Sequence, residues 1–344
     1  MWNKMVYRSL LSHSPLDAGF RLLLSFPAVS LVQGFRSFLF TSMSLSNITK
    51  AFNALAIIGL TLLTATVLPA ALTPGRVPRS AMWFCMITSW MVYSASYILI
   101  MGHQAGPQPP SGLCAIQMMT IYAAPPLTAT TGISFLVDIL LKIKKSLFTN
   151  AFGHRYTVTL LILPWVIYLV VAAAALGVIS DFSQIRRDTN NLYCHSTQET
   201  QARVSAIICI ISLVIALLVE FWIIATLYRN WALFRVKKNK MVKELHLASL
   251  IRLLLFTLQT SIGLGIGAPA ALPKASLNNN DSLTIRSALF PLLPVMCALT
   301  FGSQGDVLSF YAFWRRWRPA TAPVPHHEVT VRKSPTGSFA ASEV

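Results

Sequence analysis

Seven long apolar stretches constrain the fold of this chain more than any other feature of its sequence. Each has about 20 residues or more, enough at 1.5 Å of rise per residue to cross roughly 30 Å of bilayer hydrocarbon as an α-helix. They span approximately residues 52–72, 80–101, 113–141, 157–179, 204–228, 245–269 and 287–314. Inside lipid the backbone must satisfy its own hydrogen bonds, and barrel strands alternate over only about ten residues. The stretches therefore predict an all-α membrane protein, a seven-transmembrane helix bundle.

The basic residues of the chain predict how that bundle is oriented. The chain is 54% hydrophobic and only 11% charged, yet its net charge is +17. Cytoplasmic loops carry an excess of Lys and Arg, so the connections between stretches were compared. The first, third and fifth connections and the C-terminal tail hold seventeen, whereas the second, fourth and sixth hold five. This pattern predicts an outside N-terminus and a cytoplasmic C-terminus. It also explains the positive charge as a topology signal, so no nucleic-acid partner is expected.

Two glycosylation sequons agree with that orientation. Asn47 begins the sequence Asn-Ile-Thr before the first stretch, and Asn280 begins Asn-Asp-Ser in the sixth connection. Glycans are added on the lumenal side only, and both sites fall on the face that the charges predict to be outside. The chain is therefore expected to be a multi-pass glycoprotein of the plasma membrane or an endomembrane, surrounded by membrane lipid.

The two ends of the chain differ from its apolar middle. Residues 1–50 are interpreted as a leader, of which 1–42 would be an extension from an upstream start; a poorly formed eighth helix is the alternative. Residues 51–317 form the predicted seven-helix domain. Residues 318–344 mix Pro, Ser, Thr and charges without an apolar period, which predicts a disordered cytoplasmic tail.

Charged residues inside the stretches are the main functional candidates. Glu220, Arg252 and Asp306 lie at similar depths, roughly 10–12 Å from the predicted cytoplasmic ends of their helices. An ionisable group in hydrocarbon is costly unless it is paired or hydrated, so the three predict an interhelical charge cluster. Asp138 would join its rim or pair with Lys142 one turn away. The cluster would fasten the bundle, switch between two helix packings, or line an ion pathway.

Prolines and glycines suggest where a ligand would bind. Pro125, Pro126, Pro291 and Pro294 should kink the third and seventh helices, and glycines crowd the outer half of the sixth. Kinks open cavities, although both residue types also serve packing alone in membrane helices. The candidate pocket lies in the outer half of the bundle, with its wall formed by Trp90, Gln117, Tyr122, Gln259 and Thr260.

The sequence shows no signature of an enzyme. All seven histidines fall in loops, at helix margins or in the terminal regions, and no P-loop, GxSxG or HExxH motif occurs. No lysine in the seventh stretch could carry a retinal Schiff base. We therefore expect no catalytic activity, no metal and no cofactor.

Two cysteines lie at one mouth of the predicted bundle. Cys114 begins the third stretch, and Cys194 lies in the long fourth connection. Their placement resembles the bridge between the third helix and the second extracellular loop of G-protein-coupled receptors. A disulfide there would hold the loop across the mouth of the bundle in an oxidising compartment, and two free thiols are the alternative.

Short motifs along the chain resemble a group of fungal orphan seven-helix proteins over roughly residues 43–317. They are LTPG at 72–75, WMVYS at 90–94, GHQAGP at 102–107 and YAAPPL at 122–127. The resemblance implies a receptor-like architecture that senses an extracellular ligand and signals to a cytoplasmic partner such as a heterotrimeric G protein. The third stretch ends FLVDIL rather than Asp/Glu-Arg-Tyr, and the seventh has GDVLSFY in place of Asn-Pro-x-x-Tyr. Coupling therefore follows from architecture only, and a transporter or channel lined by the three intramembrane charges is the competing class.

Overall fold

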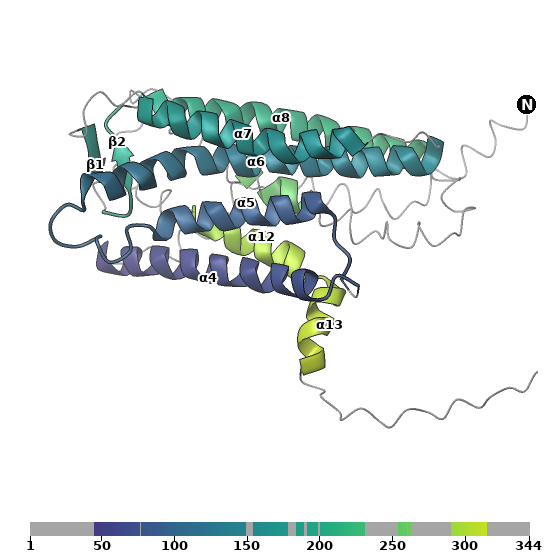
Figure 1. Cartoon of the computed structure of the whole chain (residues 1–344), viewed down its shortest axis with the longest axis horizontal. Coiled ribbons are helices and arrows are strands. Elements are labelled where there is room, and N and C mark those ends of the chain that lie inside the picture. Colours follow the sequence, from purple (N-terminus) through teal and green to yellow (C-terminus); the bar gives the residue numbers. More distant parts are fainter. Residues whose placement is uncertain are drawn as a thin grey trace, which may run out of the picture.

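A computed structural model of the chain describes residues 45–75, 77–148, 154–177, 184–188, 191–198, 200–230, 254–259, 261–262 and 290–314. Within this part of the chain the protein is a helical bundle with one short hairpin (Figure 1). Its elements are α4 (Leu45–Leu72), α5 (Ala81–Ile98), α6 (Ser111–Phe148), α7 (His154–Gly177), β1 (Ile185–Arg187), β2 (Cys194–Ser196), α8 (Thr200–Arg229), α12 (Leu292–Gly302) and α13 (Gly305–Trp314). Residues 254–259 and 261–262 are also helical.

Four of these helices, α4, α6, α7 and α8, are long and apolar enough to cross a membrane. Large apolar side chains point outward from two of them, and Leu169, Leu218 and Phe221 are 63%, 64% and 73% exposed. Such surfaces would be unfavourable in water and are expected where a helix faces lipid tails. The described helices thus indicate a multi-pass, all-α membrane protein.

The shorter helix α5 lies at the centre of the bundle. It contacts α4, α6, α7 and α12, and eleven of its eighteen residues are buried. Its hydroxyl groups bond within the protein: Ser89 meets Thr131 on α6, and Ser94 donates to the Ala56 carbonyl on α4. A helix surrounded by protein can hold such polar residues because neighbouring helices satisfy their hydrogen bonds.

Two groups of helices pack around α5. On one side α6 contacts α7 and α8, and on the other side α4 contacts α12 (Figure 1). An aromatic cluster joins the groups, with Phe256 5.7 Å from Phe301 on α12 and 6.3 Å from Trp90 on α5, measured between ring centroids. Aromatic rings in such edge-to-face contacts stabilise the core beyond the burial of their area.

The seventh predicted stretch is not one helix, which corrects the expectation for 287–314. The described part forms α12 and α13, separated by Ser303 and Gln304, and α13 turns away from the bundle (Figure 1). At the end of α12, Gly302 lies so close to α4 that an added Cβ would come within 2.8 Å of the Thr66 hydroxyl oxygen. The helix α12 ends at this contact, and the chain changes direction at Ser303 and Gln304.

Other boundaries also differ from the sequence expectation. The first helix begins at Leu45 rather than near residue 52, because no Gly or Pro interrupts 45–58. The third helix is longer than predicted, since α6 continues to Phe148. The fourth connection contains an antiparallel hairpin in which Arg186 pairs with His195. Most of the sixth stretch and the predicted tail 318–344 lie outside the described residues.

The bundle has two ends with different contents. The hairpin end consists of β1, β2 and the α5–α6 connection (99–110), and the α13 end consists of α13 and the α4–α5 connection (73–80). Figure 1 shows these ends at opposite sides of the molecule, joined by the long helices.

Candidate functional site

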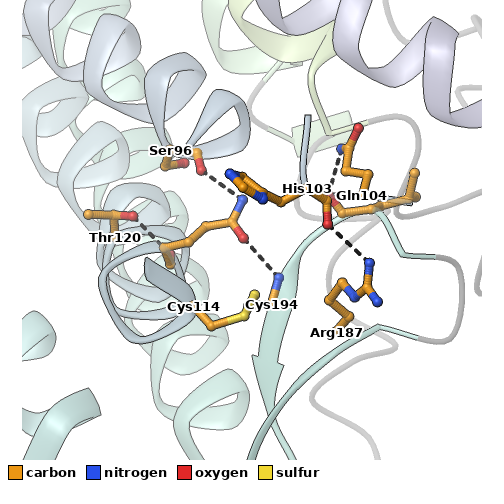
Figure 2. Close-up of a disulfide and its surroundings, with 9 residues drawn as sticks. Ser96, His103, Gln104, Cys114, Thr120, Arg187 and Cys194 are labelled. Carbon is orange, nitrogen blue, oxygen red and sulfur yellow. Dashed lines mark hydrogen bonds between the residues drawn. A yellow bond between two sulfur atoms is a disulfide. The ribbon is translucent and has the colours of Figure 1, made fainter. Parts of the chain in front are cut away.

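A disulfide anchors the hairpin to the first turn of α6. It joins Cys114 to Cys194 on β2, the pair that the sequence suggested, and their Cα atoms lie 5.3 Å apart (Figure 2). This separation is typical of bonded cysteines. Both residues are buried, together with Met118 on α6 and Ile185 on β1. The link fixes the fourth connection across one end of the bundle.

Gln117 ties the hairpin to two helices through its side-chain amide. Its Oε1 accepts a hydrogen bond from the Cys194 backbone N–H at 2.9 Å, and its Nε2 donates to the Ser96 carbonyl on α5 at 3.2 Å (Figure 2). The side chain is fully buried. Gln117 therefore satisfies the buried Cys194 N–H, a donor that would be costly to leave unpaired.

A second amide connects the hairpin to α4. Gln104 Nε2 donates to the Leu192 carbonyl at 3.1 Å and to Asn53 Oδ1 at 3.0 Å, and Asn53 Nδ2 donates back to Gln104 Oε1. Leu192 itself is fully buried and belongs to the main core cluster, together with Phe52 and Tyr97. The hairpin therefore contributes a side chain to the core of the bundle rather than lying loosely over it.

Arg187 closes the α5–α6 connection against β1. Its guanidinium donates to the carbonyl of His103 at 3.0 Å (Figure 2) and to that of Gly106 at 2.7 Å. The connection can present these carbonyls because Gly102 and Gly106 adopt φ values of +90° and +82°, which L side chains rarely reach. Thus the two glycines of the GHQAGP motif give the loop a backbone conformation that binds Arg187 of the hairpin.

The five predicted pocket residues fall into two groups. Gln117 and Tyr122 lie beside the disulfide, whereas Trp90 and Gln259 lie around Phe256 at the junction of α5, residues 254–259 and α12. The fifth, Thr260, lies outside the described residues.

At that junction two buried polar atoms have no hydrogen-bond partner among the residues that the structure describes. They are Trp90 Nε1, a donor, and Gln259 Oε1, an acceptor, on side chains that are 2% and 1% exposed. The orientation of the Gln259 amide follows from its other contact, because Nε2 donates to the Leu293 carbonyl at 2.7 Å and a carbonyl can only accept. Buried polar groups normally have partners, so these atoms are available to a small bound molecule.

Glu220 is a buried carboxylate inside the bundle. It lies on α8, is 5% exposed, and accepts a hydrogen bond from the Thr257 hydroxyl at 2.6 Å. This contact joins α8 to the helical segment 254–259. A carboxylate removed from water depends strongly on such a partner. Arg252, its predicted partner, lies outside the described residues.

Asp306 does not meet Glu220, which corrects the predicted cluster. It lies in the first turn of α13 and forms an ion pair with Arg79 from the α4–α5 connection, with 2.5 Å between Nη2 and Oδ2. The helix α13 is far from α8 in Figure 1, so the two carboxylates occupy different parts of the molecule. The sequence predicted equal depths for Glu220 and Asp306 on the assumption of one straight helix through residue 306, whereas the chain turns after Gly302.

Asp138 takes the local partner that the sequence offered as an alternative. Its Oδ2 lies 2.7 Å from Lys142 Nζ, one turn further along α6. Nearby, Lys144 Nζ lies 4.1 Å from the ring centroid of Trp222 on α8. These contacts place cationic side chains at the end of α6 that is distant from the hairpin.

Several residues in these contacts were not predicted from sequence. Gln104 and Asn53 are polar groups at the ends of apolar segments, a signal that could have singled them out. Arg79 was interpreted only as a charge that sets the topology.

Of the two glycosylation sequons, Asn47 lies exposed in the first turn of α4 rather than in a leader, and Asn280 lies outside the described residues.

Comparisons with known proteins assign no family or function to the chain. No protein-family model matches the chain, and no curated protein shows significant sequence similarity to it. Among the residues that the structure describes, no group of three or more His, Cys, Asp or Glu side chains is placed to hold a metal ion.

Proposed function

We propose that this chain is a receptor-like seven-helix membrane protein, with its N-terminus outside and its C-terminus in the cytoplasm, which senses an extracellular ligand. The observation that carries the proposal is the disulfide-anchored hairpin at one end of the bundle. Disulfides persist in oxidising compartments, so the bridge supports an extracellular or lumenal position for the hairpin end. The loop charges support the same orientation.

The long helix α6 provides a physical route for a signal. Cys114 lies near its start and Lys145 in its last turn, about 46 Å apart at 1.5 Å per residue. A displacement of the hairpin would be transmitted through the disulfide and Gln117 to α6. At the distant end, Lys142, Lys144 and Lys145 would face the cytoplasm and a partner such as a heterotrimeric G protein. The Glu220–Thr257 bond between α8 and residues 254–259 is a contact that two packings could make or break.

The unpaired atoms at the central junction suggest the kind of ligand. Trp90 Nε1 requires an acceptor and Gln259 Oε1 requires a donor, while Phe256 supplies an aromatic wall. Each atom would pair with a hydroxyl or amide group of an uncharged molecule, and none of these three residues carries a charge. The expected ligand is therefore neutral and partly apolar.

Nucleotide exchange on purified fungal Gα subunits, measured beside ion flux in liposomes, tests this function against a transporter or channel. A receptor should accelerate exchange without flux, and Glu220→Gln should alter the basal exchange rate. The matched control is Asp138→Asn, because Asp138 pairs within one helix rather than between helices. Flux without exchange would reject the receptor in favour of transport. A path lined jointly by Glu220 and Asp306 has no support in the described contacts, since each carboxylate has a different partner.

A further inference from the structure

Tyr93 is a third buried polar group on the side of α5 that carries Trp90. Its hydroxyl accepts a hydrogen bond from the Tyr97 hydroxyl at 3.1 Å, and the residue is 3% exposed. A phenol that accepts one bond still has its own hydrogen to donate. That hydrogen reaches no acceptor among the residues that the structure describes. Because buried donors are normally paired, the Tyr93 hydroxyl is available to a bound molecule in the same way as Trp90 Nε1.

Trp90 and Tyr93 form one aromatic surface with Phe256. The ring centroid of Trp90 lies 5.5 Å from that of Tyr93 and 6.3 Å from that of Phe256. All three rings belong to the main core cluster, against which Tyr193 of the hairpin also packs. Cys209 on α8 and Tyr193 are electrostatic neighbours of the Tyr93 hydroxyl. The aromatic surface therefore extends from the central junction toward the hairpin, and Tyr93 lies on its hairpin side.

The polar atoms along this surface define what a bound molecule must offer. Gln259 Oε1 is an acceptor, whereas Trp90 Nε1 and the Tyr93 hydroxyl are donors. Tyr93 follows Trp90 by three residues, so its Cα lies about 4.5 Å further along α5 toward the hairpin. A matching molecule has a donor near Gln259 and acceptor oxygens for the two donors. None of these side chains carries a charge, and a buried ion without a charged partner is costly, so the molecule is neutral.

We propose that the ligand is a neutral aromatic compound with a hydroxyl or amide donor at one end and a carbonyl oxygen at the other. The donor bonds to Gln259 Oε1 at the central junction, the ring lies along Trp90 and Phe256, and the carbonyl accepts from Tyr93 beneath the hairpin. This inference rests on the proposed function, because it names the class of ligand that the receptor would sense. It makes Tyr93 a specificity-determining residue, since a compound without the carbonyl would leave its buried donor unpaired.

A matched series of small probes tests the ligand class by ligand-observed NMR titration of the purified full chain in phosphatidylcholine nanodiscs. The probe para-hydroxyacetophenone has both polar groups, para-ethylphenol lacks the carbonyl, and para-methoxyacetophenone lacks the donor. Empty nanodiscs measure partition into lipid, which is subtracted. Each deletion should weaken binding about five-fold, because one hydrogen bond is lost and one buried group stays unpaired. The anion para-hydroxybenzoate should bind about ten-fold more weakly than the ketone.

Two phenylalanine substitutions separate the free donor from the tyrosine pair. Tyr93→Phe and Tyr97→Phe both remove the hydrogen bond between the two rings, but only Tyr93→Phe removes the donor that is offered to the ligand. The difference in affinity between para-hydroxyacetophenone and para-ethylphenol should therefore persist in Tyr97→Phe and disappear in Tyr93→Phe. Thermal unfolding of both variants checks that the fold is retained.

Three outcomes would overturn the proposal. No saturable binding of para-hydroxyacetophenone to the wild type would show that the three polar groups take ordered water only. Equal affinities for all neutral probes would show an apolar contact without recognition of the carbonyl. Equal effects of the two variants would show that Tyr93 acts only through its bond with Tyr97.

The proposed receptor activity can fail separately, because the titrations contain no G protein. Binding of the probe without nucleotide exchange on Gα would retain the ligand site and reject the receptor. Nucleotide exchange by a chain that binds none of the probes would retain the receptor and reject this class of ligand.

Discussion

The two ends of the bundle are stabilised by different chemistry. At the hairpin end a disulfide and buried neutral amides hold the chain, with Arg187 bonded to two backbone carbonyls at the surface, and Gln117, Cys194 and Leu192 are fully buried. At the α13 end the main link is the Arg79–Asp306 ion pair, whose side chains are 18% and 37% exposed. Buried neutral hydrogen bonds resist salt and solvent, whereas a partly exposed ion pair is screened. We infer that the hairpin end is the rigid part and the α13 end the adjustable one.

Removal of the disulfide should produce the largest difference between the ends. The bridge closes a loop with a sequence separation of 80, for which chain entropy gives a stabilisation of about 4 kcal/mol. Cys114→Ser/Cys194→Ser should lower the thermal unfolding midpoint in detergent, and a reducing agent should lower that of the wild type alone. The control is Cys209→Ser, which removes a cysteine outside the bridge. An unchanged midpoint would mean that the bridge does not contribute to stability.

Replacement of Gln117 tests the neutral part of the hairpin end. Gln117→Leu should cost about 1–3 kcal/mol, because the buried Cys194 N–H loses its acceptor. The matched substitution Gln198→Leu, which lies in the fourth connection and is partly exposed, should cost less. Chemical unfolding at two salt concentrations provides the measurement, and the Gln117 effect should not depend on salt. Equal costs for the two variants would contradict the role given to Gln117.

The ion pair at the α13 end should contribute less and should depend on salt. A partly exposed pair is worth about 0–1 kcal/mol, so Asp306→Asn should destabilise slightly at low salt and negligibly in 0.5 M NaCl. A double-mutant cycle with Arg79→Gln isolates the pair from the other contacts of Arg79, such as its stacking over Trp83 at 5.4 Å. A coupling energy that is unaffected by salt would contradict the inference that the two ends differ in their sensitivity to salt.

The smallest expected effect is the coupling between Glu220 and Asp306. Because each has its own partner in a different part of the bundle, the stability effects of Glu220→Gln and Asp306→Asn should add within about 0.5 kcal/mol. Unfolding midpoints of the two single variants and the double variant measure this. Coupling well above that value would restore the shared charge cluster that the sequence predicted.

The sequence by itself determined the membrane helices and the cysteine pair. Length and continuous apolarity are local properties, so α4, α6, α7 and α8 could be located to within a few residues at most ends. The helix α5 was also found, although its polar residues are explained only by its central position. Cys114 could be matched with Cys194 because both were expected at the same mouth of the bundle.

Only the tertiary structure decided the partners of the polar residues. Asp306 pairs with Arg79 across 227 positions of sequence because α12 ends at Gly302 and α13 then turns toward the α4–α5 connection. Likewise Gln117 and Gln104 bind the hairpin because its strands fold back over the bundle. The depth of a residue in a membrane helix follows from counting along the chain. Its neighbours depend on how each helix is rotated and where it breaks, which only packing between helices sets.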